Sequence, residues 1–427
     1  MSCGLDLSVP SRRESMHNRL GTLHTPLGIR DLYDSVCFCN RCGMCAPVCP
    51  AYAADPQESN SPRARNQALR LLLENKLKNN TISKELNQLI TSCTLCGRCT
   101  HVCPGQIPTA EHILELRRLL KLQLLPRSLF KLLRLRETSP RLFYAIIRIG
   151  LLSRRIGLLR LTACMPGFAW VKHLLQILPT RSIKPFAAKD QKRPTLIYLP
   201  SLEAEFLFPD LAQHVYNSAL KKYRVIVWQN TTCGLFEYLY GDVRSARKIL
   251  RRLILQHQQT ANTQLPILTD SIDVYHFLKR SAQLFHGFTA WEEKALHFAQ
   301  CVRFVTDIFP QKPSNLSACK KPVLFMNSAV FTEDSALQTK IEKKLQTLFK
   351  KNLVQCGYKD ACIAPAGYGF IKGSREAVYN LQAVRTVATH QAQTVIVLSG
   401  LAQLELNFQL RQFYPTALAQ HIANLNG

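Results

Sequence analysis

Two short cysteine runs constrain this chain more than any other feature. The first reads CNRCGMCAPVCP, Cys39 to Pro50, and the second reads CTLCGRCTHVCP, Cys93 to Pro104. Each places four cysteines at the spacing C-x₂-C-x₂-C-x₃-C, with proline after the last. Three cysteines at two-residue gaps can surround one object, because so short a loop folds back on itself. The fourth cannot reach the same object, and the proline helps to turn the chain toward a second site.

Iron–sulfur clusters account for both runs. In ferredoxins with two [4Fe–4S] clusters, the fourth cysteine of each run ligates the other cluster. A duplicated run is what such cross-ligation requires. We therefore expect a first cluster on Cys39, Cys42, Cys45 and Cys103, and a second cluster on Cys93, Cys96, Cys99 and Cys49.

Zinc and disulfides are the alternatives. Two C-x₂-C pairs can hold a structural zinc ion, but zinc takes four ligands and each run would leave sulfurs unused. A disulfide framework is typical of short secreted chains, whereas this chain has 427 residues and begins without an apolar signal segment. Sixteen cysteines in such a chain indicate a reducing compartment. Cys37, two residues before the first run, is expected to take no part.

Helical spacing dominates the N-terminal third. The segments RARNQALRLLLENKL, SKELNQLI and AEHILELRRLLKLQLL predict helices, and the second begins with a serine cap. We expect an irregular arm over residues 1–30 and an α-helical domain that holds both clusters over 31–120. A basic, leucine-rich helical connector is expected over 121–190.

A different pattern follows from residue 191 to 427. TLIYLP, RVIVWQ and LPILTD predict strands that alternate with helices, and KPVLFMNS and TVIVLSG repeat that order. Alternating strands and helices indicate parallel sheets. The expected fold class is thus α + α/β: a helical two-cluster ferredoxin domain followed by two repeated α/β lobes, 191–310 and 320–427.

Positive charge indicates an anionic partner. The net charge is +27, and residues 117–160 contain twelve Lys or Arg and one acid, Glu137. No apolar run there approaches the roughly 20 residues of a membrane span. Basic helices with an apolar face bind anionic membrane surfaces, which we expect here. A solvated face that covers the next domain is the alternative. Nucleic acid is not expected as a partner, because no binding motif or stacking face is present.

The chain resembles a known family. CGMCAPVCPAY is followed by NSPRARN, which is similar to that family's Ser-Pro-Arg-Gly-Arg stretch, and CTLCGRCTHVCPGQIP is similarly close. Shorter matches, TTCGLFEYLYGD and ACIAPAGYGF, lie in the two lobes. The family is that of glycolate oxidase iron–sulfur subunits. Its relatives include anaerobic glycerol-3-phosphate dehydrogenase and heterodisulfide reductase subunits.

The lobes depart from that family at its cysteines. Each lobe of the family carries a Cys-Cys-Gly element and further cysteines that together bind an additional metal or iron–sulfur centre. Only Cys233 and Cys362 remain here, and Ser201 and Ser328 stand near two other expected ligand positions. Two thiolates are too few for a cluster that takes about four ligands, so we expect Cys233 and Cys362 to bind none. Buried apolar packing is expected for both and for the other cysteines outside the runs: Cys3, Cys164, Cys301, Cys319 and Cys356.

Electron transfer is the function that these features predict. The chain has no G-x-G-x-x-G after a strand and no evident nucleophile–base pair, so no substrate-catalytic site of its own is expected. The resemblance implies an FAD-dependent dehydrogenase partner for a 2-hydroxyacid of the glycolate or lactate type, with FAD on that partner and not on this chain. A membrane quinone or another acceptor would take the electrons at the cytoplasmic, inner face of the cell membrane. The alternatives are a glycerol-3-phosphate dehydrogenase subunit and a degenerate scaffold for partner docking or redox sensing.

Overall fold

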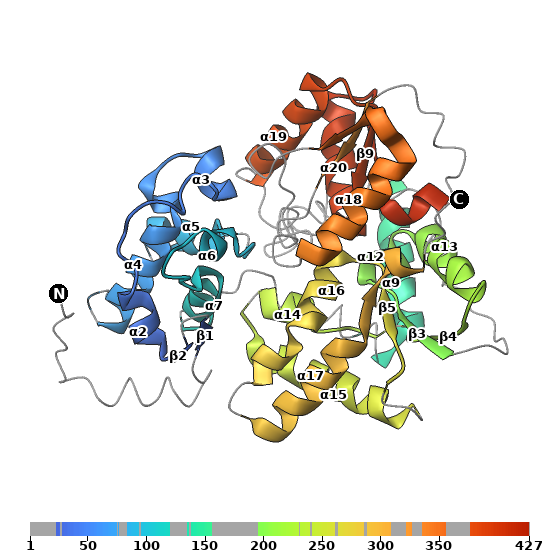
Figure 1. Ribbon diagram of the computed structural model, residues 1–427. Helices are drawn as coiled ribbons and strands as arrows, with labels where there is room; N and C mark the ends of the chain where they lie inside the picture. Colours follow the sequence, from blue (N-terminus) through green and yellow to red (C-terminus); the bar gives the residue numbers. More distant parts are fainter. Residues whose placement is uncertain are drawn as a thin grey trace.

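Helices from the N-terminal third lie beside two β-sheets that carry helices of their own (Figure 1). The computed structural model describes residues 23–25, 28–74, 76, 83–93, 95–119, 135, 138–155, 195–229, 231–239, 241–260, 264–285, 288–308, 322–326, 335–355 and 376–426. Most of the expected arm and of the expected connector therefore lies outside the described residues. The combination of helices and parallel sheets is consistent with the α + α/β class.

The helical part contains both cysteine runs. Ser61 and Ser83 cap the helices that follow them, each side-chain oxygen accepting a backbone N–H at 3.1 Å, and the Ser83 cap agrees with the sequence-based expectation. Leu69, Ile90 and Ile113 are fully buried between the helices. The elements are α2 (Leu32–Cys37), α3 (Pro50–Ala54), η1 (Glu58–Asn60), α4 (Pro62–Leu73), α5 (Lys84–Thr91), α6 (Arg98–His101) and α7 (Thr109–Leu119).

A short hairpin precedes these helices. β1 (Leu23–Thr25) and β2 (Gly28–Arg30) pair antiparallel, with Leu23 opposite Arg30. The expectation of an irregular arm is therefore wrong for these residues. Strands of three residues are too short to display the alternation from which a strand is predicted.

The first sheet has four described strands in the order β4-β3-β5-β6, all parallel. Its strands are β3 (Thr195–Leu199), β4 (Arg224–Val227), β5 (Ile267–Thr269) and β6 (Val302–Phe304). The helical elements around it are α12 (Leu202–Phe206), α13 (Pro209–Leu220), α14 (Leu235–Leu239), α15 (Val243–Gln259), α16 (Ile272–Lys279), η2 (Ser281–Phe285), α17 (Thr289–Cys301) and η3 (Val305–Asp307). The three strands expected in this lobe are all present, and β6 is an addition.

The second sheet also has four described strands, in the order β8-β7-β9-β10, all parallel. The elements are β7 (Val323–Phe325), α18 (Ser335–Phe349), η6 (Lys350–Asn352), β8 (Leu353–Gln355), α19 (Glu376–Thr389), β9 (Thr394–Val397), α20 (Gly400–Phe413), β10 (Leu418–His421) and η8 (Ile422–Asn426). In both sheets the order along the sheet is second, first, third and fourth strand. This shared order supports the expected repeat of two lobes, which stays a prediction.

The two sheets meet near the carboxyl ends of β5 and β9. The backbone N–H of Ile272 donates to the carbonyl of Leu398 at 3.0 Å, and Ser399 Oγ donates to Glu203 Oε1 at 3.4 Å. Gly400 is required there, because a Cβ at that position would lie 2.6 Å from Cγ of Glu203. The strand ends of the first lobe are therefore closed on one side by the second lobe.

Candidate functional site

The two cysteine runs adopt the same backbone shape. Arg41 and Gly43 in the first run have positive φ, and Leu95 and Gly97 have it at the equivalent positions of the second. Few residues other than glycine occupy this left-handed region, so Arg41 and Leu95 are held there by their surroundings. The turn bonds are also equivalent: Ala46 N to Gly43 O and Thr100 N to Gly97 O are both 2.9 Å. Two loops of one shape fit two copies of one ligand.

The structure brings the fourth cysteine of each run to the other run. Burial, together with the nearby thiolates of Cys39, Cys103 and Cys49, raises the pKa of Cys45 to about 11. Burial likewise raises the pKa of Cys99, and Cys96, Cys93 and Cys49 add to the rise. Cys103 thus lies near the first run, and Cys49 lies near the second and also within reach of the first.

The two predicted ligand sets differ in exposure. Cys42 is exposed, whereas Cys49 and Cys93 are buried, and the remaining ligand candidates are half-buried. We call the first set the outer set (Cys39, Cys42, Cys45 and Cys103) and the second the inner set (Cys93, Cys96, Cys99 and Cys49).

Donor groups surround the sulfurs, and sequence reasoning missed them. Arg65 Nη1 donates to Cys49 Sγ at 3.4 Å, and the backbone N–H of Leu95 donates to Cys93 Sγ at the same distance. Asn66 Nδ2 lies 3.7 Å from Cys39 Sγ. Arg65 and Asn66 both belong to NSPRARN, the stretch that carried the family resemblance. The stretch that contains both donors was therefore visible in the sequence, although nothing in the sequence assigned these two side chains to the sulfurs.

A buried histidine orients one of these donors. His112 Nδ1 donates to Asn66 Oδ1 at 2.8 Å, and its Nε2 is hydrogen-bonded to Ser35 Oγ at 2.9 Å. An amide oxygen only accepts, so Nδ1 carries the proton and Asn66 Nδ2 is turned toward Thr109 and Cys39. Burial lowers the pKa of His112 to about 3, so the ring is neutral at physiological pH.

The donor set fits iron–sulfur clusters. Thiolates are the ligands of [4Fe–4S] clusters, and soft sulfur donors favour such centres over single hard cations. Bringing several buried thiols together is unfavourable to their ionised forms unless a metal compensates the charge. Within the described residues, no group of three or more His, Cys, Asp or Glu side chains is arranged to hold a metal ion. That finding concerns a single ion, whereas a cluster of four iron atoms is wider and its ligands lie further apart.

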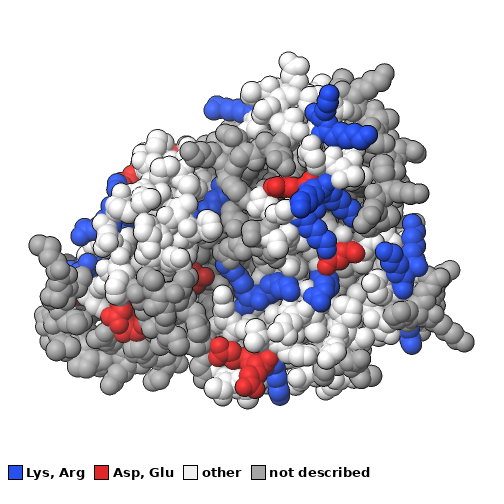
Figure 2. All heavy atoms as spheres, in the orientation of Figure 1, with Lys and Arg blue, Asp and Glu red and all other residues white. Residues whose placement is uncertain are grey.

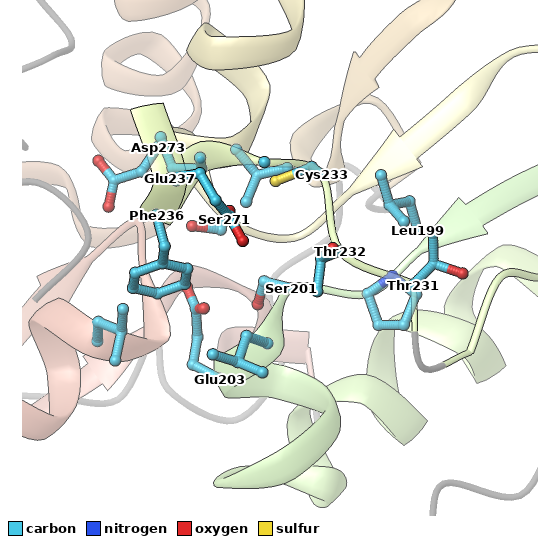
Figure 3. A pocket seen from close by; sticks show the side chains of 16 residues that line it. Leu199, Ser201, Glu203, Thr231, Thr232, Cys233, Phe236, Glu237, Ser271 and Asp273 are labelled. Atoms are coloured by element: carbon cyan, nitrogen blue, oxygen red, sulfur yellow. The ribbon is translucent and has the colours of Figure 1, made fainter. Parts of the chain in front are cut away.

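A second feature lies at the strand ends of the first lobe, where Figure 3 shows Cys233, Ser201 and Glu237 around a cavity. The space measures about 30 Å³, enough for a water molecule or two. Ser201 acts as the N-cap of α12, its oxygen accepting the N–H of Ala204 at 3.2 Å. Cys362 and Ser328, the expected counterparts in the second lobe, lie outside the described residues.

Carboxylates surround the sulfur of this cavity. Burial raises the pKa of Cys233 to about 12, and the charges of Glu237 and Glu203 contribute. Burial and the charge of Asp270 raise the pKa of Glu203 itself to about 7. Burial acts in the same direction on the pKa of Cys45 and Cys99 in the cysteine runs. The surroundings of Cys233 differ in that its charged neighbours are carboxylates, whereas those of Cys45 and Cys99 are other thiols.

Comparison with known families agrees with the cysteine geometry. Residues 35–107 match the family of 4Fe-4S dicluster domains. The match begins in α2 and ends just after the second cysteine run, so it includes both ligand sets. The chain therefore carries a ferredoxin-type iron–sulfur domain.

The curated relatives are iron–sulfur subunits of oxidoreductases. The glycolate oxidase iron–sulfur subunit of Escherichia coli is 29% identical over 27% of this chain and 28% of its own length. A probable glycolate oxidase iron–sulfur subunit of Bacillus subtilis is 29% identical over 18% of this chain and 17% of its own length. The Hdr-like menaquinol oxidoreductase iron–sulfur subunit 2 of Archaeoglobus fulgidus is 33% identical over 19% of this chain and 18% of its own length.

These matches confirm the resemblance to glycolate oxidase iron–sulfur subunits over a limited length. The chain spans less than a third of each of these relatives. No solved structure matches the chain. What the relatives share with this chain is thus an iron–sulfur module.

Proposed function

We propose that this chain is the iron–sulfur subunit of a respiratory 2-hydroxyacid dehydrogenase of the glycolate or lactate type. Its described residues include two cysteine runs of the same backbone shape, and the fourth cysteine of each lies near the other run. This proximity is the observation that carries the proposal, because it supports two neighbouring [4Fe–4S] clusters. Such clusters accept and release one electron at a time.

The proposed role assigns a task to each domain. The helical domain, 31–120, holds the ligands, and the lobes, 191–310 and 320–427, form a body on which partners dock. The carboxylates around Cys233 support the proposal that the first lobe binds no further cluster. FAD and the substrate then belong to a partner subunit, so electrons enter this chain from that partner.

A membrane surface is the second proposed partner. No described helix is long and apolar enough to cross a membrane. On α9 (Pro140–Arg155), Phe143 and Ile147 face the protein and are 2% and 6% exposed. An apolar stripe lies on the opposite side of the helix, with exposed fractions between 40% and 66%: Leu142, Ile146, Ile149 and Leu152.

Basic residues border this stripe. Arg141 and Arg148 are exposed on one flank of α9, and Lys and Arg also spread over the helices around the sheets on the face that Figure 2 shows. A helix with an apolar stripe and a basic flank binds flat in the interface of an anionic bilayer. The proposed acceptor is therefore a membrane quinone, at the inner face of the cell membrane.

Anaerobic purification with a tag on this chain tests the main proposal. We expect about eight iron atoms per chain, from two four-iron clusters, and a flavoprotein that copurifies. Glycolate or lactate should then reduce the iron–sulfur signals, and glycerol-3-phosphate should not. One zinc ion or four iron atoms per chain would contradict the ligand assignment. Eight iron atoms without a flavoprotein or substrate reduction would favour the docking or redox-sensing scaffold.

A further inference from the structure

The inner and outer cysteine sets differ in the charge that surrounds their sulfurs. Arg65 is only 1% exposed and donates to Cys49, a member of the inner set. Its other nitrogens donate to the carbonyl of Leu89 at 3.2 Å and to Ser92 Oγ at 3.0 Å. These bonds fix the guanidinium, so its positive charge is held beside the inner set and away from solvent.

A second buried arginine lies beside the same set. Arg98 is 4% exposed and follows Cys96 by two residues. Its Nε and Nη2 atoms are buried, so its positive charge is held out of solvent within two residues of a ligand of the inner set. The inner set therefore has two buried arginines beside it, one from α4 and one from the cysteine run itself.

The outer set has no comparable buried charge among the described residues. Its Cys39 faces the neutral amide of Asn66, and Cys42 is exposed to solvent. Arg63 lies against the first run, its Nη1 donating to the carbonyl of Arg41 at 3.5 Å, but its side chain is 35% exposed and pairs with Glu58 at 2.6 Å. Water and the glutamate screen its charge, so it stabilises added negative charge less than a buried arginine does.

We propose that Arg65 and Arg98 give the inner set the higher reduction potential, so that electrons pass from the outer set to the inner set. The inference rests on the proposed function. Reduction adds one negative charge, which a buried cation and a hydrogen bond to a ligand sulfur both stabilise. Burial alone would act in the opposite direction, because a low dielectric penalises the added charge. The two arginines reverse that penalty.

The transfer is a single-electron exchange. One electron leaves the cluster of the outer set, which is oxidised, and reduces the cluster of the inner set, without breaking a bond or moving a proton. Arg65 and Arg98 are positioning residues in this step. Their effect therefore has to be measured as a potential.

Redox titration of the full chain, followed by electron paramagnetic resonance, tests this directly. In the wild type we expect two potentials, and Cys42→Ser should perturb the signal of the lower one. Arg65→Gln and Arg98→Gln should each lower the higher potential, by an amount equivalent to about tenfold in the electron-transfer equilibrium, or about 59 mV for one electron. Arg63→Gln is the matched control and should leave the higher potential in place, because Arg63 lies at the outer set. Arg65→Lys keeps the charge and should restore most of the shift.

The possible results separate this inference from the proposed function. If the higher potential belongs to the signal that Cys42→Ser perturbs, the inference is wrong although the chain still contains two clusters. It is equally wrong if both glutamine variants retain eight iron atoms and both potentials. Should Arg65→Gln lose its iron, Arg98→Gln decides the outcome. A wild type without two clusters would overturn the proposed function and the inference together.

Discussion

At the scale of single residues, His112 makes the helical domain sensitive to acid. Its folded pKa is about 3, well below the usual value of 6.5, because the ring is buried. The unfolded chain therefore binds a proton more readily than the folded one between these pH values. The contribution of neutral His112 to the free energy of unfolding is complete above about pH 6.5. It is lost as the pH falls toward 3, by up to about 1.4 kcal/mol for each pH unit.

We therefore expect the amides of α7 to exchange hydrogen faster, relative to their intrinsic rates, at pH 5 than at pH 7. His112→Gln should remove most of this pH dependence, because glutamine binds no proton in that range. His390→Gln is the control, since His390 is exposed. An unchanged pH dependence in His112→Gln would show that other groups govern the acid sensitivity.

Cysteine substitutions test the exchange of ligands between the runs. Cys103→Ser should damage the cluster of Cys39, Cys42 and Cys45 and spare that of its own run, because its sulfur lies near Cys45. Cys233→Ala should leave the iron content and the rate of electron transfer unchanged. Iron analysis and electron paramagnetic resonance of both variants check this. Loss of the second run's signal in Cys103→Ser would contradict the assignment.

The sequence predicts the ligands but not their environment. The cysteine spacing is a local property, so the ligand assignment can be made from the sequence alone, and it stays a prediction. The contact of Arg65 with Cys49 joins residues 16 positions apart, and that of His112 with Asn66 spans 46. No local pattern encodes such contacts. They depend on how α4 and α7 pack.

At the scale of elements, most segments were predictable, and two edge strands were not. The expected helix in RARNQALRLLLENKL is α4, and the expected strand in TVIVLSG is β9. β6 and β8 went unrecognised, although β5 and β7 are as short and were expected. Each missed strand lies at one edge of its sheet and is defined by its pairing with a neighbour, which a single sequence does not display.

Helix α9 should bind anionic vesicles through its apolar stripe. Ile149→Gln should weaken binding by about 1–2 kcal/mol, because a large apolar side chain no longer enters the interface. Arg148→Gln should weaken it by about 1 kcal/mol, and added salt should remove that part. Vesicle cosedimentation measures both effects. Leu296→Gln changes an equally exposed apolar residue on α17 and serves as the control.

Binding to neutral and anionic vesicles alike, or equal losses in Ile149→Gln and Leu296→Gln, would contradict this orientation of α9. A stripe that only covers a neighbouring protein surface would show no dependence on lipid charge. The sequence predicted a basic, apolar connector over 121–190. Only the exposed and buried faces of α9 indicate which side of it would meet the lipid.

At the scale of the whole molecule, one arginine joins the cluster domain to the first lobe. Arg117 at the end of α7 is 1% exposed. Its Nη1 donates to the carbonyl of Leu239 at 2.6 Å, and its Nη2 donates to the carbonyl of Cys93 at 2.7 Å. Cys93 belongs to the inner set and Leu239 ends α14, the helix beside the Cys233 cavity. In Figure 1, α7 and α14 face each other across this junction.

Arg117→Met should therefore loosen both partners of this junction. The substitution leaves buried carbonyls without a donor, at about 1–3 kcal/mol for each unsatisfied group. We expect faster hydrogen exchange in α14 and in the loop around Cys93, together with a cluster of the inner set that is lost sooner in air. Arg63→Met, at a partly exposed position on α4 that pairs with Glu58, is the matched control and should change neither. If exchange rises only in α14, the two domains are joined by other contacts and the lobe does not support the cluster loop. If both rise together, contact with the first lobe holds the loop of the inner set in place.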